Sequence, residues 1–219
     1  MLKRETMPWC IDLHIHTRRY SPCAESLDPQ HLPALLPRMG VSGIVITEHD
    51  HLWPRRDIDA LNRELTAGRI YRGVEVSSRN GHFIVIGITS MAGITPGISA
   101  RALIQTARSQ DAAVILAHPH VHYSQTRCPL DVLEMPAGID AVEVASTITV
   151  GEAAEYAREC ATHLGCAMVG GSDAHALSQV GRTFTFFSTL PADESELADA
   201  IRNGRCAAGR AIDSMAAAG

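Results

Sequence analysis

Short apolar runs separated by amphipathic stretches recur along most of this 219-residue chain. The apolar runs predict β-strands over residues 10–16, 43–47, 70–76, 83–88, 113–117, 139–144, 167–169 and 182–187. Helical periodicity predicts helices over 28–39, 58–66, 100–110, 152–164 and 194–203. Pro33 and Pro37 are expected to kink or shorten the first helix. Nearly unbroken apolar runs such as 43–47 are typical of strands buried on both faces, and their alternation with helices predicts a parallel sheet or barrel.

The order of these elements favours one α/β domain over residues 1–219, with a motif-bearing region at about 10–187 and a closing strand and helix over 182–209. The chain has no internal repeat, no low-complexity block and no linker rich in Ser or Gly, and an Ala/Gly-rich tail follows Gly209. A barrel fits better than an open sheet because the carboxyl ends of all its strands converge on one face.

Seven of the eleven histidines, together with Glu75 and Asp173, lie in short motifs beside the apolar runs. The motifs are Asp12-Leu13-His14-Ile15-His16, Thr47-Glu48-His49-Asp50, Gly73-Val74-Glu75-Val76, Gly81-His82-Phe83, Ala117-His118-Pro119-His120 and Gly171-Ser172-Asp173-Ala174-His175. Neutral imidazoles and carboxylates are the ligands that divalent transition metals and zinc use in proteins. Their convergence at one barrel face predicts a polynuclear metal site.

The spacing of these residues along the chain predicts a more specific role for some of them. His14 and His16 are two apart on a strand and so share a face, on which Asp12 is a candidate to orient an imidazole. The Gly170-Gly171 pair is expected to permit close backbone approach to ligands or bound substrate. His120 and His122 are expected at the rim.

Glu75 has two interpretations. Alone at the end of an apolar strand it favours an ion pair with Arg72 or Arg79, since a lone buried carboxylate is costly. Among the other motifs it favours a carboxylate that bridges two metals.

Charge and composition limit the classes of substrate and binding partner that this protein is expected to have. Nineteen Lys and Arg against 24 Asp and Glu, for a net charge of −5, argue against a protein that coats duplex nucleic acid. Two or three divalent cations would add about +4 to +6 locally and attract an anionic substrate. The expected partner is a small phosphorylated substrate or a short nucleic-acid end, with no membrane and no stable duplex DNA. No run is long enough to span a membrane, no secretory signal is found, and the six cysteines lack C-x-x-C spacing, so a cytoplasmic location is expected.

The ordered set DLHIHT, ITEHD, GVEVS, GHF, AHPH and GSDAH resembles the PHP (polymerase and histidinol phosphatase) superfamily over residues 10–187. The resemblance implies a distorted (β/α)7 barrel with a metal cluster at the C-terminal ends of its strands. It implies one metal held by His14, His16, Glu75 and Asp173, and a second held by Glu75, His118 and His82. A third would use His49, His175 and one more ligand near the first strand. Two or three Zn, Mn or Fe ions are therefore expected.

Three motifs depart from the family pattern. The segment after the first histidine pair is Ser21-Pro22-Cys23-Ala24-Glu25, where many members carry Ser-Asp-Gly or a histidine, so that Glu25 or Cys23 completes the third site or the site is weak or absent. The TDH motif of many members is Thr47-Glu48-His49. Ile84 stands where many members have the fourth-strand histidine, and His82 lies two residues earlier on the same face.

The expected function is that of a metal-dependent phosphoesterase, a phosphoric ester hydrolase. A metal-bound hydroxide would attack a small phosphate monoester, a nucleotide or an oligonucleotide end. His49 and His175 are the catalytic candidates, acting with the metal-bound water to stabilise or protonate the leaving oxygen if the third metal is missing. Arg182 is the candidate phosphate clamp, with Arg18, Arg19 and Arg127 as alternatives at the pocket mouth.

Two other functions remain open. An amidohydrolase-like metal hydrolase would cleave a C–N or C–O bond, but it usually needs a bridging lysine or carboxylate on the fourth strand, and no lysine follows Lys3. A non-catalytic metal-binding regulatory domain is favoured only by the altered segment from Ser21 to Glu25.

Overall fold

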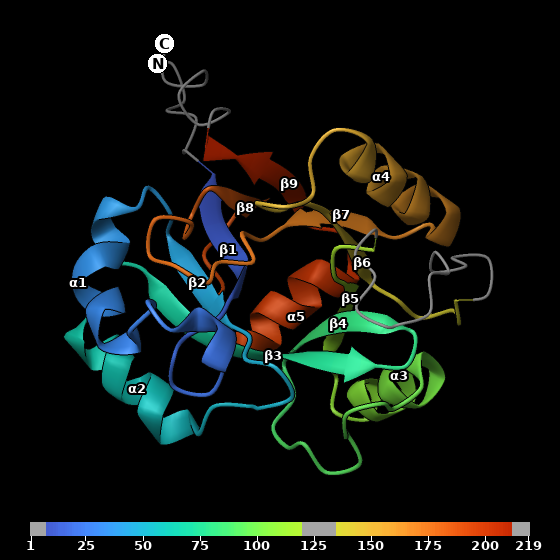
Figure 1. The fold of residues 1–219 in the computed structure, drawn as a ribbon, viewed down its shortest axis with the longest axis horizontal. Coiled ribbons are helices and arrows are strands. Elements are labelled where there is room, and N and C mark those ends of the chain that lie inside the picture. The colour runs from blue at the N-terminus through green and yellow to red at the C-terminus, as the bar shows by residue number, and fades with distance from the viewer. Residues whose placement is uncertain (1–7, 120–134, 212–219) are drawn as a thin grey trace.

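The computed structural model describes residues 8–119 and 135–211, and their strands form one sheet in the order β7-β6-β5-β4-β3-β2-β1-β8-β9 (Figure 1). The strands are β1 (Trp9–Ile15), β2 (Gly43–Ile46), β3 (Arg69–Ser78), β4 (Gly81–Ile86), β5 (Ala113–Leu116), β6 (Ala141–Ala145), β7 (Ala167–Gly170), β8 (Thr183–Phe187) and β9 (Ala207–Arg210). The α-helices are α1 (Leu32–Leu35), α2 (Arg55–Glu64), α3 (Ala100–Arg108), α4 (Glu152–Leu164) and α5 (Glu194–Arg202). Three short 3-10 helices are η1 (Pro22–Ala24), η2 (Pro29–His31) and η3 (Leu36–Arg38).

The sheet curls until its ends meet. At the end of β7, the Gly170 N–H donates to Thr185 Oγ1 of β8 at 2.9 Å. The segment after β7 then runs parallel to the end of β1, where the His16 N–H donates to the Ala174 carbonyl at 2.9 Å. The prediction of a distorted α/β barrel is therefore confirmed, as a nearly closed mixed sheet.

Strand direction differs from the all-parallel expectation. β4 runs antiparallel to β3 and to β5, and β8 runs antiparallel to β1 and to β9. A tight turn at Arg79 and Asn80 joins β3 to β4, and a turn this short can connect only antiparallel strands. As a result β4 begins at the edge of the sheet where β3 ends.

An apolar cluster fills the barrel interior, and α5 closes one end of it. Alternate residues of β1 to β8 point inward, among them Leu13 and Ile115, and meet Leu197 and Ile201 of α5. Figure 1 shows α5 inside the ring of strands. The buried face of this helix explains its amphipathic sequence.

Helix boundaries follow local chemistry. The predicted helix over 28–39 is broken into η2, α1 and η3, with Pro29, Pro33 and Pro37 near the start of each piece, because proline lacks the N–H that would continue the preceding turn. α3, α4 and α5 begin and end within a residue or two of the predicted bounds, and α2 begins three residues earlier than predicted. β9 was not predicted, since its Ala and Gly residues carry no strand signal.

None of the helices in residues 8–119 and 135–211 is both long and apolar enough to cross a membrane. That residues 1–219 form a single domain stays a prediction.

Candidate metal centre

Strand ends bring the predicted histidines and carboxylates together at the end of the barrel opposite α5. His14 lies on β1, Glu75 on β3 and His82 at the start of β4. The others follow a strand: His16 follows β1, His49 follows β2, His118 follows β5, and Asp173 and His175 follow β7. His82 comes from the start of its strand, and it reaches the site because β4 is antiparallel.

Glu75 is the centre of the cluster. Its Oε2 lies 2.8 Å from His49 Nδ1, 3.2 Å from His16 Nε2 and 3.5 Å from His14 Nε2. Its Oε1 lies 2.7 Å from His82 Nδ1 and 3.1 Å from His118 Nε2. The carboxylate is fully buried. The alternative of an ion pair with Arg72 or Arg79 is not found among the described residues, where the ion pairs of Glu75 are all with histidines.

Asp173 lies on the other side of the first histidine pair. Its Oδ1 is 3.4 Å from His14 Nε2 and 3.3 Å from His16 Nε2. The two Nε2 atoms are themselves only 3.0 Å apart, and both rings are fully buried. Two ring nitrogens that face each other at this distance need a proton or a cation between them, since two lone pairs repel.

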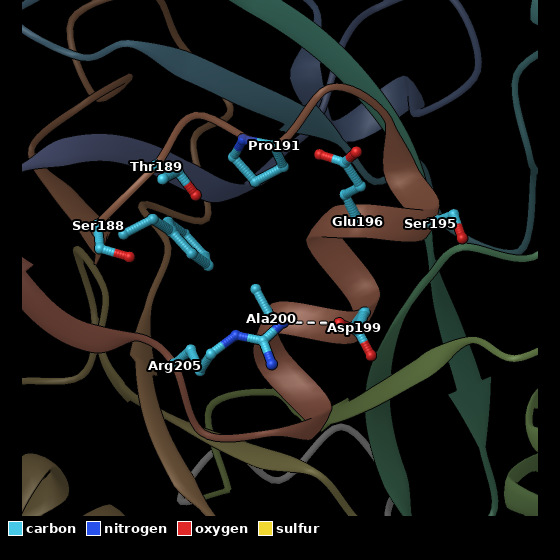
Figure 2. A pocket seen from close by; sticks show the side chains of 9 residues that line it. Ser188, Thr189, Pro191, Ser195, Glu196, Asp199, Ala200 and Arg205 are labelled. Carbon is cyan, nitrogen blue, oxygen red and sulfur yellow. Dashed lines mark hydrogen bonds and ion pairs between the residues drawn. The ribbon is translucent and has the colours of Figure 1, made fainter.

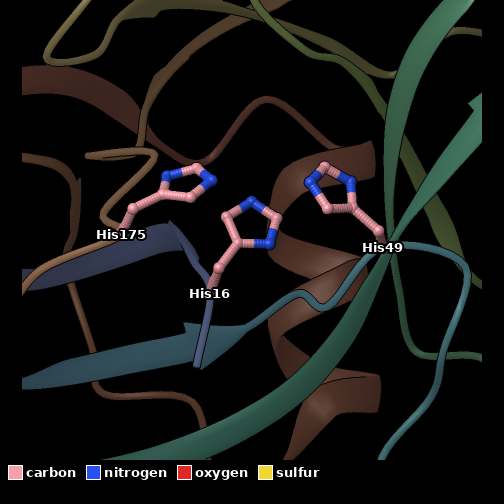
Figure 3. Close-up of side chains that lie close together, drawn as sticks. All are labelled: His16, His49 and His175. Carbon is pink, nitrogen blue, oxygen red and sulfur yellow. The ribbon is translucent and has the colours of Figure 1, made fainter. Parts of the chain in front are cut away.

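A third group consists of His16, His49 and His175, whose ring nitrogens lie within 4.8 Å of one another. Figure 3 shows the three imidazoles side by side, each from a different strand end. His16 is therefore a further candidate for the ligand near the first strand, beside Glu25 and Cys23. Both of those side chains are exposed, and neither belongs to a candidate metal group among the described residues.

Glu143 on β6 is a site residue that the motifs missed. Its Oε1 lies 3.0 Å from His14 Nδ1, and its Oε2 accepts the His118 backbone N–H at 3.2 Å. It is 1% exposed, so both bonds are shielded from water. A glutamate between apolar residues in Ala141-Val142-Glu143-Val144 was the available signal, because a buried carboxylate needs partners.

Gly171 makes the contact between Glu143 and His14 possible. A Cβ at this position would lie 2.6 Å from His14 Cβ and 2.9 Å from Glu143 Oε1, closer than real atoms approach. A Cβ at Gly170 would lie 2.6 Å from the Phe184 carbonyl of β8. The glycine pair thus allows close approach to β1, β6 and β8. That it also permits close approach to a ligand stays a prediction.

Two other buried carboxylates hold the backbone. Asp12 accepts backbone N–H bonds from His14, Ser172 and Gly181 at 3.2, 2.7 and 2.8 Å. It therefore fixes strand ends, and the expectation that it orients an imidazole is wrong, since Glu143 does so. Glu48 accepts from the Thr17 N–H and from Trp53 Nε1, and so holds the loop after β1 against the loop after β2.

Strained backbone supports the placement of these side chains. Asp50, His118 and Asp173 have φ values of 52°, 24° and 54°, in or beside the left-handed region that non-glycine residues avoid. Such conformations cost of order 1–3 kcal/mol each and persist where the surroundings enforce them, often at functional sites.

The charges of the cluster compensate one another. Burial alone would lower the pKa of His14, but neighbouring carboxylates, with Asp173 and Glu143 foremost, raise it well above the ordinary value. In the same way burial lowers but Glu75 raises the pKa of His118. Burial would raise the pKa of Glu75, yet the adjacent histidines hold it well below its usual range. The buried carboxylates thus favour positive charge beside them, which a protonated imidazole or a bound cation would supply.

The donor set fits divalent cations. Glu75 Oε2 is buried and has no hydrogen bond of acceptable geometry, although three ring nitrogens surround it. Candidate groups among the described residues are His14, His16 and Glu75; His49, Glu75 and His82; His14, His118 and Glu143; and His16, His49 and His175. Imidazole and carboxylate ligands without thiolates suit Zn²⁺, Mn²⁺ or Fe²⁺.

The predicted arginines have less support. Arg182 is exposed, and its Nε donates to the Ser178 carbonyl at 2.7 Å, so its role as a phosphate clamp stays a prediction. Arg18 is exposed and pairs with Asp28. Arg127, His120 and His122 lie outside the described residues.

A cavity of about 440 Å³ lies at the α5 end of the barrel (Figure 2). It is lined by Phe187, the loop after β8 and one face of α5, including the Arg205–Asp199 ion pair at 2.6 Å. Phe187 pairs with Trp9 at the start of β1, whereas His14 and His16 lie at the end of this strand. The cavity is therefore separate from the histidine cluster.

Comparison with known proteins supports the fold. A family model described as PHP-associated matches residues 151–206, and a sequence comparison with curated proteins gives no match. A two-domain protein from Bacteroides vulgatus, containing a predicted PHP-like metal-dependent phosphoesterase, is 19% identical with a TM-score of 0.68, over 93% of this chain and 65% of that one. This chain thus spans only part of that relative.

Two further solved structures have the same fold. An amidohydrolase from Chromobacterium violaceum with bound sulfate is 18% identical with a TM-score of 0.62, over 90% of this chain and 96% of that one. A lesion-specific endonuclease from Pyrococcus furiosus is 16% identical with a TM-score of 0.60, over 92% of this chain and 58% of that one.

Proposed function

Since this chain has the fold of the PHP superfamily, we propose that it is a metal-dependent phosphoesterase that hydrolyses a small phosphate monoester, a nucleotide or an oligonucleotide end. The observation that carries the proposal is the buried Glu75 carboxylate, contacted on both oxygens by five histidines. Together with the histidines around it, such a carboxylate would hold two divalent cations and offset their charge.

The ligand sets that we propose follow these contacts. His14, His16, Glu75 and Asp173 would hold one cation, and Glu75, His82 and His118 a second. His16, His49 and His175 would hold a third. Bound cations would supply Lewis acidity, polarising a phosphoryl group and lowering the pKa of a coordinated water.

Protein side chains then set geometry and protonation. Glu143 accepts a hydrogen bond from Nδ1 of His14, which keeps the proton on that nitrogen. The lone pair of His14 Nε2 would then be available to bind a cation. His175 has a lowered pKa, caused by burial and by the charge of His16, against which the Asp173 carbonyl acts by accepting from Nδ1 at 3.0 Å. Its Nε2 then carries a lone pair that would bind a cation. Where no third cation is bound, the doubly protonated form of His175, together with His49, would give a proton to the leaving oxygen.

The test is metal content and turnover of the same preparation. Elemental analysis of protein purified without chelator should give two or three metals per chain, and p-nitrophenyl phosphate should be hydrolysed when Mn²⁺ is present. Asp173→Asn should lose metal and turnover together. Protein that stays without metal after soaking in Mn²⁺ or Zn²⁺ would end the proposal.

A second candidate is hydrolysis of a C–N bond, because one protein of the same fold is named an amidohydrolase. The absence of any lysine after Lys3 argues against a bridging lysine, although Glu75 is a carboxylate in a comparable role. Turnover of amide substrates by metal-loaded protein that leaves p-nitrophenyl phosphate intact would favour this candidate.

A further inference from the structure

Aromatic side chains gather on the loops after β1 and β2, and the proposed hydrolysis does not use them. The rings of Tyr20 and His51 stack with centroids 3.8 Å apart, and Trp53 meets Tyr20 edge-on at 5.4 Å. The Arg19 guanidinium lies 5.4 Å from the centre of the Tyr20 ring and 5.5 Å from that of Trp53. We call Arg19, Tyr20, His51 and Trp53 the aromatic shelf.

The two loops that carry the aromatic shelf also carry residues of the candidate metal centre. Ser21 follows Tyr20, and its Oγ lies 3.4 Å from His16 Nδ1 and accepts the His49 N–H at 3.3 Å. On the other side, Trp53 Nε1 donates to Glu48 at 2.9 Å, next to His49 in the chain. The shelf and the candidate metal centre therefore share two loops, which favours a ligand that contacts both.

A cavity of about 580 Å³ adjoins the shelf. Arg19 and Trp53 line it together with Gln30, His31, Asp57 and Glu64. This volume falls within the range of small-molecule sites, and the polar side chains offer both donors and acceptors to the edge of a heterocycle.

Packing alone does not require the whole shelf. Trp53 is buried and serves the core, but Tyr20 and His51 are only half-buried, and the Arg19 side chain is 49% exposed. Partly exposed rings and a guanidinium plane are surfaces on which nucleic-acid bases stack, with little preference for one base over another.

We infer that the aromatic shelf binds the base of a nucleotide whose phosphate lies at the metal centre. This inference rests on the proposed function and narrows its substrate class from phosphate monoesters in general to nucleotides. The base would stack on the open faces of the shelf, and its polar edge would meet the side chains of the adjoining cavity.

A binding experiment on metal-free protein tests the shelf without turnover. The chain has two tryptophans, so Trp9→Phe leaves Trp53 as the only one that emits. Adenosine monophosphate should change this emission to saturation, whereas ribose 5-phosphate, which lacks the base, should not. Adding Tyr20→Ala should weaken the nucleotide affinity by about fivefold to a hundredfold, as expected for loss of one stacking ring. Equal responses to the two ligands would overturn the inference.

Kinetics with Mn²⁺ supply the second readout. The ratio of kcat/KM for adenosine monophosphate to that for ribose 5-phosphate should exceed one. It should fall about fivefold to a hundredfold in Tyr20→Ala and be kept in Tyr20→Phe, which retains the ring. Trp9→Phe, exposed at the far end of β1, is the matched control and should leave the ratio unchanged.

The outcomes separate the two proposals. If metal-loaded protein hydrolyses neither compound, the proposed function is contradicted. The emission titration then still tests whether the shelf binds the base. Hydrolysis of both with a ratio near one, or a ratio that Tyr20→Ala leaves unchanged, overturns the shelf and leaves the phosphoesterase in place.

Discussion

Replacement of Glu143 by glutamine tests how the histidines of the candidate metal centre are held in position. The carboxylate makes two buried bonds, one with His14 Nδ1 at 3.0 Å and one from the His118 N–H at 3.2 Å. Glutamine has nearly the same shape but only one acceptor oxygen. In Glu143→Gln the amide oxygen can accept from one of the two N–H donors, while the amide NH2 group faces the other. One of the two buried hydrogen bonds is therefore lost.

The size of the effect follows from these two bonds. Losing a partner that orients a metal-binding histidine typically lowers metal affinity by about tenfold to a hundredfold, which corresponds to about 1.4–2.7 kcal/mol. A buried donor left without an acceptor also costs about 1–3 kcal/mol of folding stability. We therefore expect weaker metal binding at unchanged stoichiometry, and a lower free energy of unfolding in the metal-free protein.

The assay is a competition titration of Zn²⁺ or Mn²⁺ against a chromogenic chelator, beside urea unfolding of chelator-treated protein. Glu159→Gln, exposed on α4, is the matched control and should behave as the wild type. Affinity and stability equal to wild type would refute the orienting role. Loss of one whole metal per chain would also refute it, since Glu143 would then be a ligand.

Three further predictions use the same contacts. Gly171→Ala should lower the free energy of unfolding by about 1–3 kcal/mol in urea, because its Cβ would lie 2.6 Å from His14 Cβ; an unchanged midpoint would contradict the close approach. Burial lowers but carboxylate partners raise the pKa of His14 and His118, so thermal melts of chelator-treated protein should show stability falling as pH rises above about 6.5; stability that rises over this range would refute the pairing. Asp173→Asn should leave a folded chain with reduced metal content, whereas Glu25→Ala, altering an exposed side chain, should change neither metal content nor rate.

Much of the fold could be predicted because apolar periodicity reports burial directly. The strands from β1 to β8 and the helices α2 to α5 begin and end near their predicted bounds. Strand direction was not predictable in this way, since an apolar run has the same pattern whichever way it points. The reversal of β4 depended on the short turn at Arg79 and Asn80, and β9 gave no signal because Ala and Gly pack without a period.

The members of the candidate site were mostly visible in the sequence, but their mutual contacts were not. Motif residues such as His14 and Glu75 were named because polar groups beside apolar strands need a reason to be there. Glu143 was missed because it stands alone on its strand, without a second polar residue to form a motif. Asp12 was only a candidate to orient an imidazole, and the structure surrounds it with backbone N–H groups from three segments.

The sequence by itself determined which residue types reach the end of the barrel, since the spacing of histidines and carboxylates against apolar strands is a local property. Tertiary structure alone decided that Glu75 is shared by five histidines and that His16 lies between His49 and His175. These contacts join segments far apart in the chain, so they depend on barrel closure and on strand direction. The local sequence pattern shows which side chains stand at the strand ends, whereas the distances between these side chains depend on how the whole sheet curls.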